Sequence, residues 1–420
     1  MKFLKIGGLI GVVALAFGIG FSWRDLRSGE LPSKATVEKL LGSPAKRESA
    51  TRIFKTNFNL ILTNYYKPVD PKELKYSGME GLLAALGDPH TIFLEPKTAE
   101  EFSKETKGEN EFVGVGARLG RDPVGAKIMT VFDGGPAQRA GVRNGDVIVS
   151  VDGEPAGGIP LDDVVKKIRG KEGTVVTLEV MRAGAAKTLK ISIKRGTINP
   201  PTADGMVIEG TRIGLLTVQQ FAQPTTTQFD QALAKLEEQG IVGLVIDVRN
   251  NPGGLLETAV EMLSRFVENK VVVRMKMKNG REEFAKTFVG SKRPFQYPVV
   301  VLVNEDSASA AEIFAGVLRD YKLATLVGEH TYGKASVQNV FMLVDGSSAK
   351  ITIARYYLPS NAEMSRKVDE EGQYVSGGLT PDVKVPIDVT EMTNLGDPKT
   401  DSQLKKALEI IGSKTAHRTN

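Results

Sequence analysis

Residues 243–266 read GLVIDVRNNPGGLLETAVEMLSRF, which is the pattern of a strand, a tight turn and a helix. The run 243–248 is apolar except for Asp247 and lacks the alternation of a half-exposed strand, and 255–266 has the spacing of an amphipathic helix. A strand that is apolar on both sides is typical of a parallel sheet covered by helices. The sequence therefore predicts an α/β domain around this stretch.

The same alternation continues on both sides of this stretch, from about residue 198 to residue 390. Further buried strands are expected at 299–303 and 324–327, with a helix at 310–318 between them. The runs 337–343 and 351–355 flank an Asp-Gly turn, which predicts a β-hairpin. We assign 198–390 to one α/β domain.

Composition excludes several classes of protein. Among 420 residues, 41% are hydrophobic and 25% are charged, as in soluble globular proteins, so a disordered or fibrous chain is excluded. Lys and Arg exceed Asp and Glu only by 55 to 50, an excess too thin to indicate a nucleic-acid partner. The chain has no cysteine and only three histidines, His90, His330 and His417. Disulfides and a cysteine nucleophile are excluded, and neither a metal nor another cofactor is expected.

The amino terminus has the pattern of an export signal. Lys2 and Lys5 precede the apolar run 6–21, which is short for a membrane-spanning helix. We expect residues 1–24 to be a signal peptide or a membrane anchor, and the sequence leaves the choice open. The rest of the chain is then exported, either to the periplasm or anchored to the outer face of the inner membrane.

Two further segments frame the chain. Apolar residues at helical spacing predict a helical domain over 33–107. The C-terminal segment 391–420 is mostly polar and is expected to form a tail with one short helix, 403–411, ended by Gly412.

Residues 108–197 contain the glycine-rich stretch GGPAQRAGVRNGDVIVSVDG at 134–153, which resembles bacterial PDZ domains. This resemblance implies that a peptide adds as a strand beside an edge strand, while backbone amides capture its terminal carboxylate. It places the amides at 113–116 and the other wall of the groove at the helix 161–169. The alternative is that these glycines only allow a strand to bend. The substrate-binding residues so implied, with a preference for a nonpolar terminal residue, are Val113, Gly114, Val115, Gly116, Val164 and Ile168.

Two strand-to-helix junctions carry candidate chemistry. In the first, 247–254, glycines expose backbone N–H groups at a helix start, which suits an anion, although a tight turn explains them equally. The second, 303–312, reads VNEDSASAAE. Ser309 and Glu312 fit a helix-capping box, but Ser309 also fits a nucleophile at the positive end of a helix. The local pattern leaves both interpretations open.

A nucleophilic serine needs a base. His330 is the only histidine in the second half of the chain before the tail. A lysine can serve instead when burial lowers the pKa of its amine. Lys334, in the loop GEHTYGKAS at 328–336, follows a buried strand, but this position alone is weak support.

The motifs at 303–316 (V-N-x-x-S-A-S-A-x-E-I-x-A-G) and 327–338 (V-G-E-x-T-x-G-K-x-x-x-Q) resemble the carboxyl-terminal processing (tail-specific) serine peptidases. RNNPGGLL at 249–256, GDPH at 87–90 and the PDZ-like stretch belong to the same pattern, so the resemblance covers about residues 50–390. It implies a multidomain α/β protein with a crotonase-like peptidase core. Two positions depart from the family pattern, Ala311, where serine is common, and Ala335, where glycine is common.

The resemblance also implies roles for individual residues. Ser309 is the nucleophile, Lys334 the general base, and Gln338 orients the lysine. The oxyanion hole consists of the Ala310 N–H and the N–H of a glycine in the turn, for which we favour Gly254 over Gly253.

We therefore expect a serine endopeptidase that cleaves exported proteins near their C-termini and binds their tails through its PDZ domain. The alternative is an inert PDZ scaffold, which the presence of Ser309, Lys334 and Gln338 argues against. An adaptor protein and a homo-oligomer are left open.

Overall fold

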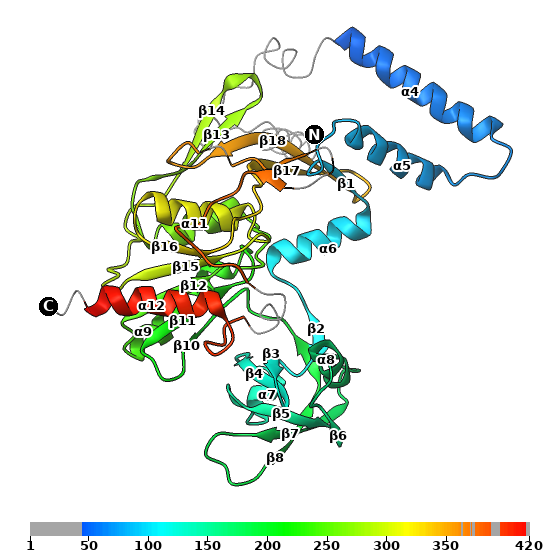
Figure 1. Cartoon of the computed structure of the whole chain (residues 1–420). Helices are drawn as coiled ribbons and strands as arrows, with labels where there is room; N and C mark the ends of the chain where they lie inside the picture. Colours follow the sequence, from blue (N-terminus) through cyan, green and yellow to red (C-terminus); the bar gives the residue numbers. More distant parts are fainter. Residues whose placement is uncertain (1–43, 363, 370, 372–373, 388–394, 417–420) are drawn as a thin grey trace, which may run out of the picture. The chain divides into compact units, whose positions relative to one another are not determined.

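The computed structural model describes residues 44–362, 364–369, 371, 374–387 and 395–416 (Figure 1). The expected export signal, 1–24, lies outside these residues. Among the described helices, none is both long enough and apolar enough to cross a membrane. The chain forms two compact units: the smaller holds the described residues up to Ala99 and Gln338–Thr352, and the larger holds Glu100–Val337 and the described residues from Ile353 onward.

The smaller unit begins with two helices. Asp70 caps the second of them by accepting a hydrogen bond from the Lys72 N–H, and Pro71 occupies its first turn, as is typical of helix starts. The expected hairpin at 337–343 and 351–355 is confirmed as β17 and β18, which both continue into the larger unit. The helices and strands are α4 (Pro44–Asn64), α5 (Pro71–Ala84), β1 (Ile92–Leu94), β17 (Ser336–Met342) and β18 (Ser348–Tyr357), followed in the chain after β1 by α6 (Pro96–Lys107).

The larger unit contains the predicted α/β domain. Its sheet has the order β10-β11-β12-β15-β16-β21, in which only β10 runs antiparallel to its neighbour. The expected buried strands are therefore confirmed. The strands are β10 (Ala203–Val207), β11 (Ile213–Val218), β12 (Gly243–Asp247), β15 (Val299–Val303), β16 (Thr325–Gly328) and β21 (Val383–Lys384).

Helices cover both faces of this sheet. Alternate residues of β12 and β15 point to opposite sides, as the two-residue period of a strand requires. Leu244 and Ile246 pack with helices α9 (Thr225–Glu238), α10 (Leu256–Leu263) and α11 (Ala310–Asp320), whereas Val245 packs with α12 (Ser402–Ala416). Burial on both faces explains why these strands are continuously apolar.

Helix α12 is anchored more firmly than its polar sequence suggests. Its residues Leu404, Ala407 and Ile411 are fully buried against the sheet. The approach is so close that a Cβ on Gly243 would lie 2.2 Å from Ile411 Cγ2. The expected helix end at Gly412 is wrong, because the helix continues to Ala416. An interior glycine costs a helix only about 1 kcal/mol, which the buried side chains offset.

The PDZ-like residues form a second sheet in the larger unit, with the order β3-β4-β5-β7-β8 and antiparallel pairing. Helix α8 packs on its core through Val164 and Ile168. The run 112–119 forms two strands, because the chain turns at Gly116 with a φ of 82°. The elements are β2 (Phe112–Gly114), β3 (Ala117–Asp122), β4 (Gly125–Val131), α7 (Pro136–Arg139), β5 (Val147–Val151), β6 (Glu154–Pro155), α8 (Leu161–Ile168), β7 (Val175–Met181), β8 (Leu189–Lys194) and β9 (Gly196–Ile198).

The remaining strands of the larger unit form two groups. Strands β13 and β14 continue the sheet from the end of β18, and the segments that contain β19 and β20 are hydrogen-bonded to the loop after β16. Strand β13 pairs antiparallel with β14 and with the end of β18, where Arg274 lies opposite Tyr357. These elements are β13 (Val271–Met277), the 3₁₀ turn η1 (Lys278–Gly280), β14 (Glu282–Lys286), β19 (Lys367–Val368) and β20 (Tyr374–Ser376). The crotonase-like relationship of the core stays a prediction.

Candidate active site

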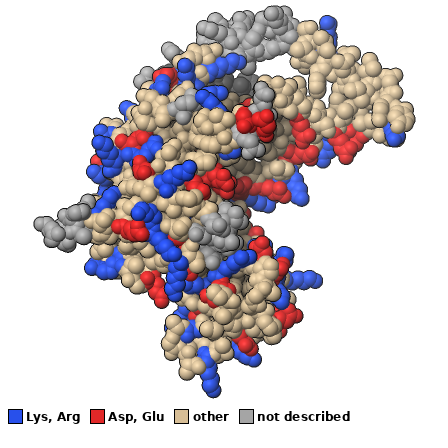
Figure 2. Space-filling view, in the orientation of Figure 1, with Lys and Arg blue, Asp and Glu red and all other residues tan. Residues whose placement is uncertain are grey.

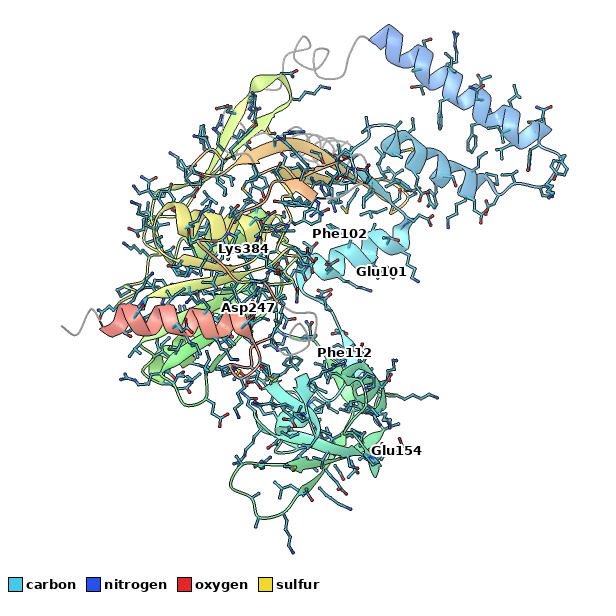
Figure 3. The ribbon with its side chains drawn as sticks, viewed as in Figure 1. Glu101, Phe102, Phe112, Glu154, Asp247 and Lys384 are labelled. Atoms are coloured by element: carbon cyan, nitrogen blue, oxygen red, sulfur yellow. The ribbon has the colours of Figure 1, made fainter. Side chains whose placement is uncertain are left out.

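The two candidate junctions lie side by side because β12 and β15 are parallel neighbours, so their carboxyl ends share one edge of the sheet. Asp247 marks this edge in Figure 3. Asn304 Nδ2 donates to Asn250 Oδ1 at 2.6 Å, and the Asn250 N–H donates to Asn304 Oδ1 at 2.8 Å. The Ser307 hydroxyl donates to the Val248 carbonyl at 2.8 Å. The two junctions are therefore one hydrogen-bonded structure.

Ser309 directly precedes helix α11 in a conformation that is rare for a residue with a side chain. Its φ is 54° and its ψ is −115°. Such a backbone costs about 1–3 kcal/mol and persists only where its surroundings fix it. Gly253 provides part of these surroundings, since a Cβ there would lie 2.7 Å from Ser309 Cβ and 2.9 Å from the Ala310 nitrogen. Only glycine allows this approach.

The hydrogen bonds of the glycine turn distinguish Gly253 from Gly254. The Gly253 N–H donates to Asn251 Oδ1 at 2.8 Å. Phe221 and Gly254 form an isolated parallel β-bridge: the Phe221 N–H donates to the Gly253 carbonyl, and the Leu255 N–H donates to the Phe221 carbonyl. Within the described part of the chain, no hydrogen bond uses the Gly254 N–H. The Ala310 N–H belongs to the first turn of α11, where amides have no partner inside the helix.

Glu312 joins the start of α11 to the loop that carries Lys334. Its side chain is fully buried, and its carboxylate accepts four hydrogen bonds, from the Ser309 N–H at 2.8 Å, Thr331 Oγ1 at 2.5 Å, the Gly333 N–H at 2.7 Å and the Lys334 N–H at 2.9 Å. Burial raises the pKa of the Glu312 carboxyl, while these donors act in the opposite direction. One carboxylate thus fixes the backbones of Ser309 and Lys334 with respect to each other.

Tyr356 of β18 makes a second connection to the Lys334 loop. It is buried, and its hydroxyl donates to the Lys334 carbonyl at 2.5 Å and lies 3.5 Å from the Ser309 carbonyl oxygen. Burial, together with the charge of Glu312, raises the pKa of Tyr356, so the phenol stays protonated and can donate.

The Lys334 loop is covered by the segments that contain β19 and β20. The Thr331 N–H donates to the Leu379 carbonyl at 3.0 Å, and the Leu379 N–H donates back to Thr331 Oγ1 at 2.7 Å. The Arg366 N–H donates to the Gly333 carbonyl at 2.8 Å. The ring of His330 stacks on Tyr374 with centroids 4.1 Å apart. The position of Lys334 is thus set by backbone bonds on both sides of its loop.

Gln338, the third residue of the implied catalytic set, lies on β17. Its side-chain amide donates to Thr352 Oγ1 at 3.0 Å. Its role as the residue that orients Lys334 stays a prediction.

The implied PDZ residues lie in and beside the PDZ core. Val113 and Gly114 belong to β2, which pairs with β9, and Gly116 forms the bend before β3. Val115, Val164 and Ile168 are buried in the hydrophobic core of this domain. Their role in a groove stays a prediction.

Comparison with known proteins identifies the family. The model of peptidase family S41 matches residues 212–385, and a PDZ domain model matches 127–182. The carboxy-terminal processing protease CtpB of Bacillus subtilis (strain 168) is 32% identical over 369 residues, which cover 86% of this chain and 76% of CtpB. The chain belongs to the carboxy-terminal processing proteases of peptidase family S41. This confirms the resemblance found in the sequence and makes the protein a serine-type peptidase.

Two further proteins agree with this assignment. A CtpA-like serine protease of Staphylococcus aureus (strain MSSA476) is 32% identical over 374 residues, covering 86% of this chain and 72% of the relative. A solved S41-family structure from Bacteroides fragilis NCTC 9343, only 16% identical, covers 80% of this chain and 90% of its own, with a TM-score of 0.52. The second likeness supports the fold of the protease alone.

Sequence reasoning missed three features of the protease. Glu312 was interpreted only as half of a capping box, although the spacing to Ser309 was its signal. Tyr356 carries no local signal, because its contact with Lys334 depends on how β18 is placed. The reciprocal pair Asn250 and Asn304 could have been found from the two asparagines that follow neighbouring strands.

We predict that Glu312→Gln loosens the whole site. An amide replaces one acceptor oxygen by an NH₂ group that faces buried donors, and each donor left unpaired costs about 1–3 kcal/mol. The urea midpoint, followed by circular dichroism, should fall clearly. Glu329→Gln, on the same loop, is the matched control and should change the free energy of unfolding by less than about 0.5 kcal/mol. Equal midpoints for the two variants would contradict the role of Glu312.

Proposed function

We propose that this protease cleaves peptide bonds with Ser309 as nucleophile and Lys334 as general base. The observation that carries this proposal is the Glu312 carboxylate, which binds the backbone N–H groups of both residues. Both residues also follow strands of one parallel sheet, at the edge where active sites of such sheets are found.

The chemistry follows from these groups. The neutral amine of Lys334 takes the Ser309 hydroxyl proton as Oγ attacks the carbonyl carbon of the substrate. The resulting lysinium gives this proton to the departing amine. Lys334 then takes a proton from the water that hydrolyses the acyl-enzyme, and returns it to Ser309 Oγ as the acid product leaves. Gln338 holds the lysine side chain in this account.

The N–H groups of Gly254 and Ala310 hold the oxyanion in this account. The turn supports Gly254 over Gly253, because the Gly253 N–H already donates to Asn251. The first-turn amide of α11 adds the favourable end of a helix dipole to the same site.

The substrates we propose are exported proteins, cleaved near their C-termini. In the PDZ domain, β3 pairs with β4 on one side, and no strand of the described residues pairs with its other edge. A peptide can therefore add as a further strand there. Lys, Arg, Asp and Glu are interspersed on the face shown in Figure 2, which supports a protein substrate rather than nucleic acid.

The first prediction of this mechanism concerns the dyad. Ser309→Ala, Lys334→Ala and the double variant should lose activity to about the same extent, because the two residues act as a unit. Lys334→Arg should be equally inactive, since a guanidinium cannot act as a neutral base. Cleavage of a fluorogenic peptide and labelling of Ser309 by a fluorophosphonate measure this.

The control for the dyad is His330→Phe, which keeps a ring against Tyr374 and should keep most activity. If the His330→Phe variant were inactive while a folded Lys334→Ala variant stayed active, a serine–histidine mechanism would replace this one.

The pH dependence gives a separate prediction. The kcat/KM of the unaltered protease should rise with pH to a plateau, because a lysine base works only when deprotonated.

A further prediction concerns the substrate tail. Amidating the C-terminus of a model substrate, or adding charged residues to it, should slow cleavage below saturation, because the PDZ amides bind a free carboxylate. Changing the N-terminus of the same substrate is the control and should have no effect. Equal rates for the free-acid and amidated tails would show that the terminal carboxylate is not recognised.

We also propose that the protease works outside the cytoplasm, on the basis of Lys2, Lys5 and the apolar run 6–21. A reporter that is active only after export, fused after residue 35, should be active, and a fusion that lacks residues 1–24 should not. Activity of only a cytoplasm-specific reporter at the same fusion point would refute this location.

A further inference from the structure

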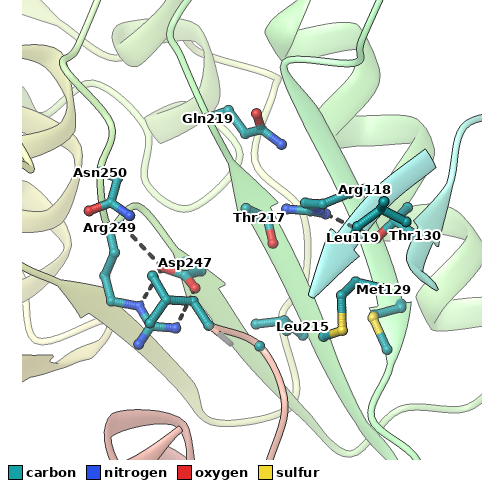
Figure 4. A pocket seen from close by; sticks show the side chains of 13 residues that line it. Arg118, Leu119, Met129, Thr130, Leu215, Thr217, Gln219, Asp247, Arg249 and Asn250 are labelled. Atoms are coloured by element: carbon teal, nitrogen blue, oxygen red, sulfur yellow. Dashed lines mark hydrogen bonds and ion pairs between the residues drawn. The ribbon is translucent and has the colours of Figure 1, made fainter. Parts of the chain in front are cut away.

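The buried guanidinium of Arg249 stands at the start of the turn that leads to Gly254. Its five N–H groups all have acceptors: Nε and Nη2 donate to Asp247, Nη1 and Nη2 donate to Asp401, and Nη1 also donates to Gln403 Oε1. These distances lie between 2.7 and 3.0 Å. The pair with Asp247 is drawn in Figure 4. Arg249 is thus held by one carboxylate from its own strand and by two residues from the C-terminal segment.

Both members of the long-range pair are charged at neutral pH. Burial would lower the pKa of Arg249, but Asp247 and Asp401 raise it above its ordinary value. Burial would raise the pKa of Asp401, yet Arg249 and two backbone amides bring it below its ordinary value. An ion pair that is buried and also hydrogen-bonded fixes direction as well as distance.

Asp401 is itself held firmly. It accepts hydrogen bonds from the Gly396 N–H and the Leu404 N–H, both at 2.9 Å, and helix α12 follows directly. The buried Leu404 and Ile411 anchor that helix to the sheet. The matched segment of the S41 family model ends at residue 385, so this support comes from a part of the chain beyond it.

On one side the turn borders a cavity. Asp247, Arg249 and Asn250 line a cavity of about 310 Å³, together with Gly396 (Figure 4). Side chains that border a cavity lack the contacts that would hold them in a filled core. On this side, the bonds of Arg249 to Asp401 and Gln403 therefore hold the turn.

Only four residues, 250–253, separate Arg249 from Gly254, and hydrogen bonds connect them to one another and to their neighbours. Asn250, the next residue, has a φ of 57° and is bonded to Asn304 in both directions. Asn251 then fixes Gly253 through its side chain and Ala308 through its carbonyl. A change at Arg249 thus reaches the Gly254 amide without passing through Ser309 or Lys334.

We propose that Asp401 is a positioning residue for the oxyanion hole, acting through Arg249 on the turn 247–254. The inference rests on the proposed function, because it assigns the Gly254 N–H to the oxyanion. Gln403 assists by accepting from the remaining Nη1–H.

The test compares Asp401→Asn and Gln403→Met in the full chain, with a fluorogenic peptide as substrate. Loss of an oxyanion donor lowers kcat by about 10²–10³. A donor that is displaced rather than removed should lower kcat by about tenfold in Asp401→Asn and by less in Gln403→Met. KM should change less than about twofold. Inhibition by a peptide boronate, whose tetrahedral adduct needs the oxyanion hole, should weaken in parallel with kcat.

Asp397→Asn is the matched control. Asp397 lies on the same loop, is also buried, and pairs with Lys127 at 3.1 Å instead of with Arg249. It should keep the kcat and the boronate affinity of the unaltered protease. Gln403→Met keeps the ion pair, so it remains informative if Asp401→Asn does not fold at the assay temperature.

The outcomes separate this inference from the proposed function. If Gln403→Met and a folded Asp401→Asn only melt at a lower temperature, with unchanged kcat and boronate affinity, Asp401 is structural and the inference is wrong. An equal kcat loss in Asp397→Asn would also overturn it, since the effect would then belong to the loop and not to Arg249. Activity that survives Ser309→Ala would instead refute the proposed function.

Discussion

The carboxylate of Glu312 is the interaction on which the arrangement of the site depends. A buried carboxylate is costly unless donors surround it, and here the donors are the backbone N–H groups of Ser309, Gly333 and Lys334 with the Thr331 hydroxyl. The four bonds close a ring between the start of α11 and the loop after β16. Because the four donors belong to four different residues, neither segment can move without leaving a buried group unpaired.

This ring explains how the site tolerates the strain at Ser309. Ser309 keeps its unusual backbone because Glu312 on one side and Gly253 on the other leave it no alternative. Ala335, where glycine is common, fits without strain. It is not among the residues with positive φ, and its carbonyl accepts the Tyr356 N–H at 3.0 Å. The glycine that the loop does require is Gly333, with a φ of 90° and backbone atoms packed against it.

Much of the fold could be predicted from local patterns, because strands buried on both faces are continuously apolar, as in 243–246 and 299–303. The candidate nucleophile and base came from motifs, and the capping box of Ser309 was visible beside them. A capping role does not exclude a nucleophilic one, since the capping carboxylate of Glu312 also binds the Lys334 N–H. Contacts such as Tyr356 with Lys334, or Asp401 with Arg249, join segments far apart in sequence and leave no periodic signal. The sequence did predict a short helix at 403–411, but its polar composition gave no sign that Leu404, Ala407 and Ile411 anchor it to the sheet.

The parallel sheet accounts for the spacing of the site along the chain. Strands β12, β15 and β16 are consecutive neighbours, so the loops that follow them meet at one edge although a helix or a longer connection separates each pair. Each loop supplies one part: the glycine turn, the serine at a helix start, and the lysine. The strands fix only where the three loops begin, so the rest of each loop has to be held by bonds to other segments. Glu312 provides them between the second and third loops, and Asn304 between the first and second. The first loop is also held from the face of the sheet that α12 covers, because the buried guanidinium of Arg249 donates to Asp401 and Gln403.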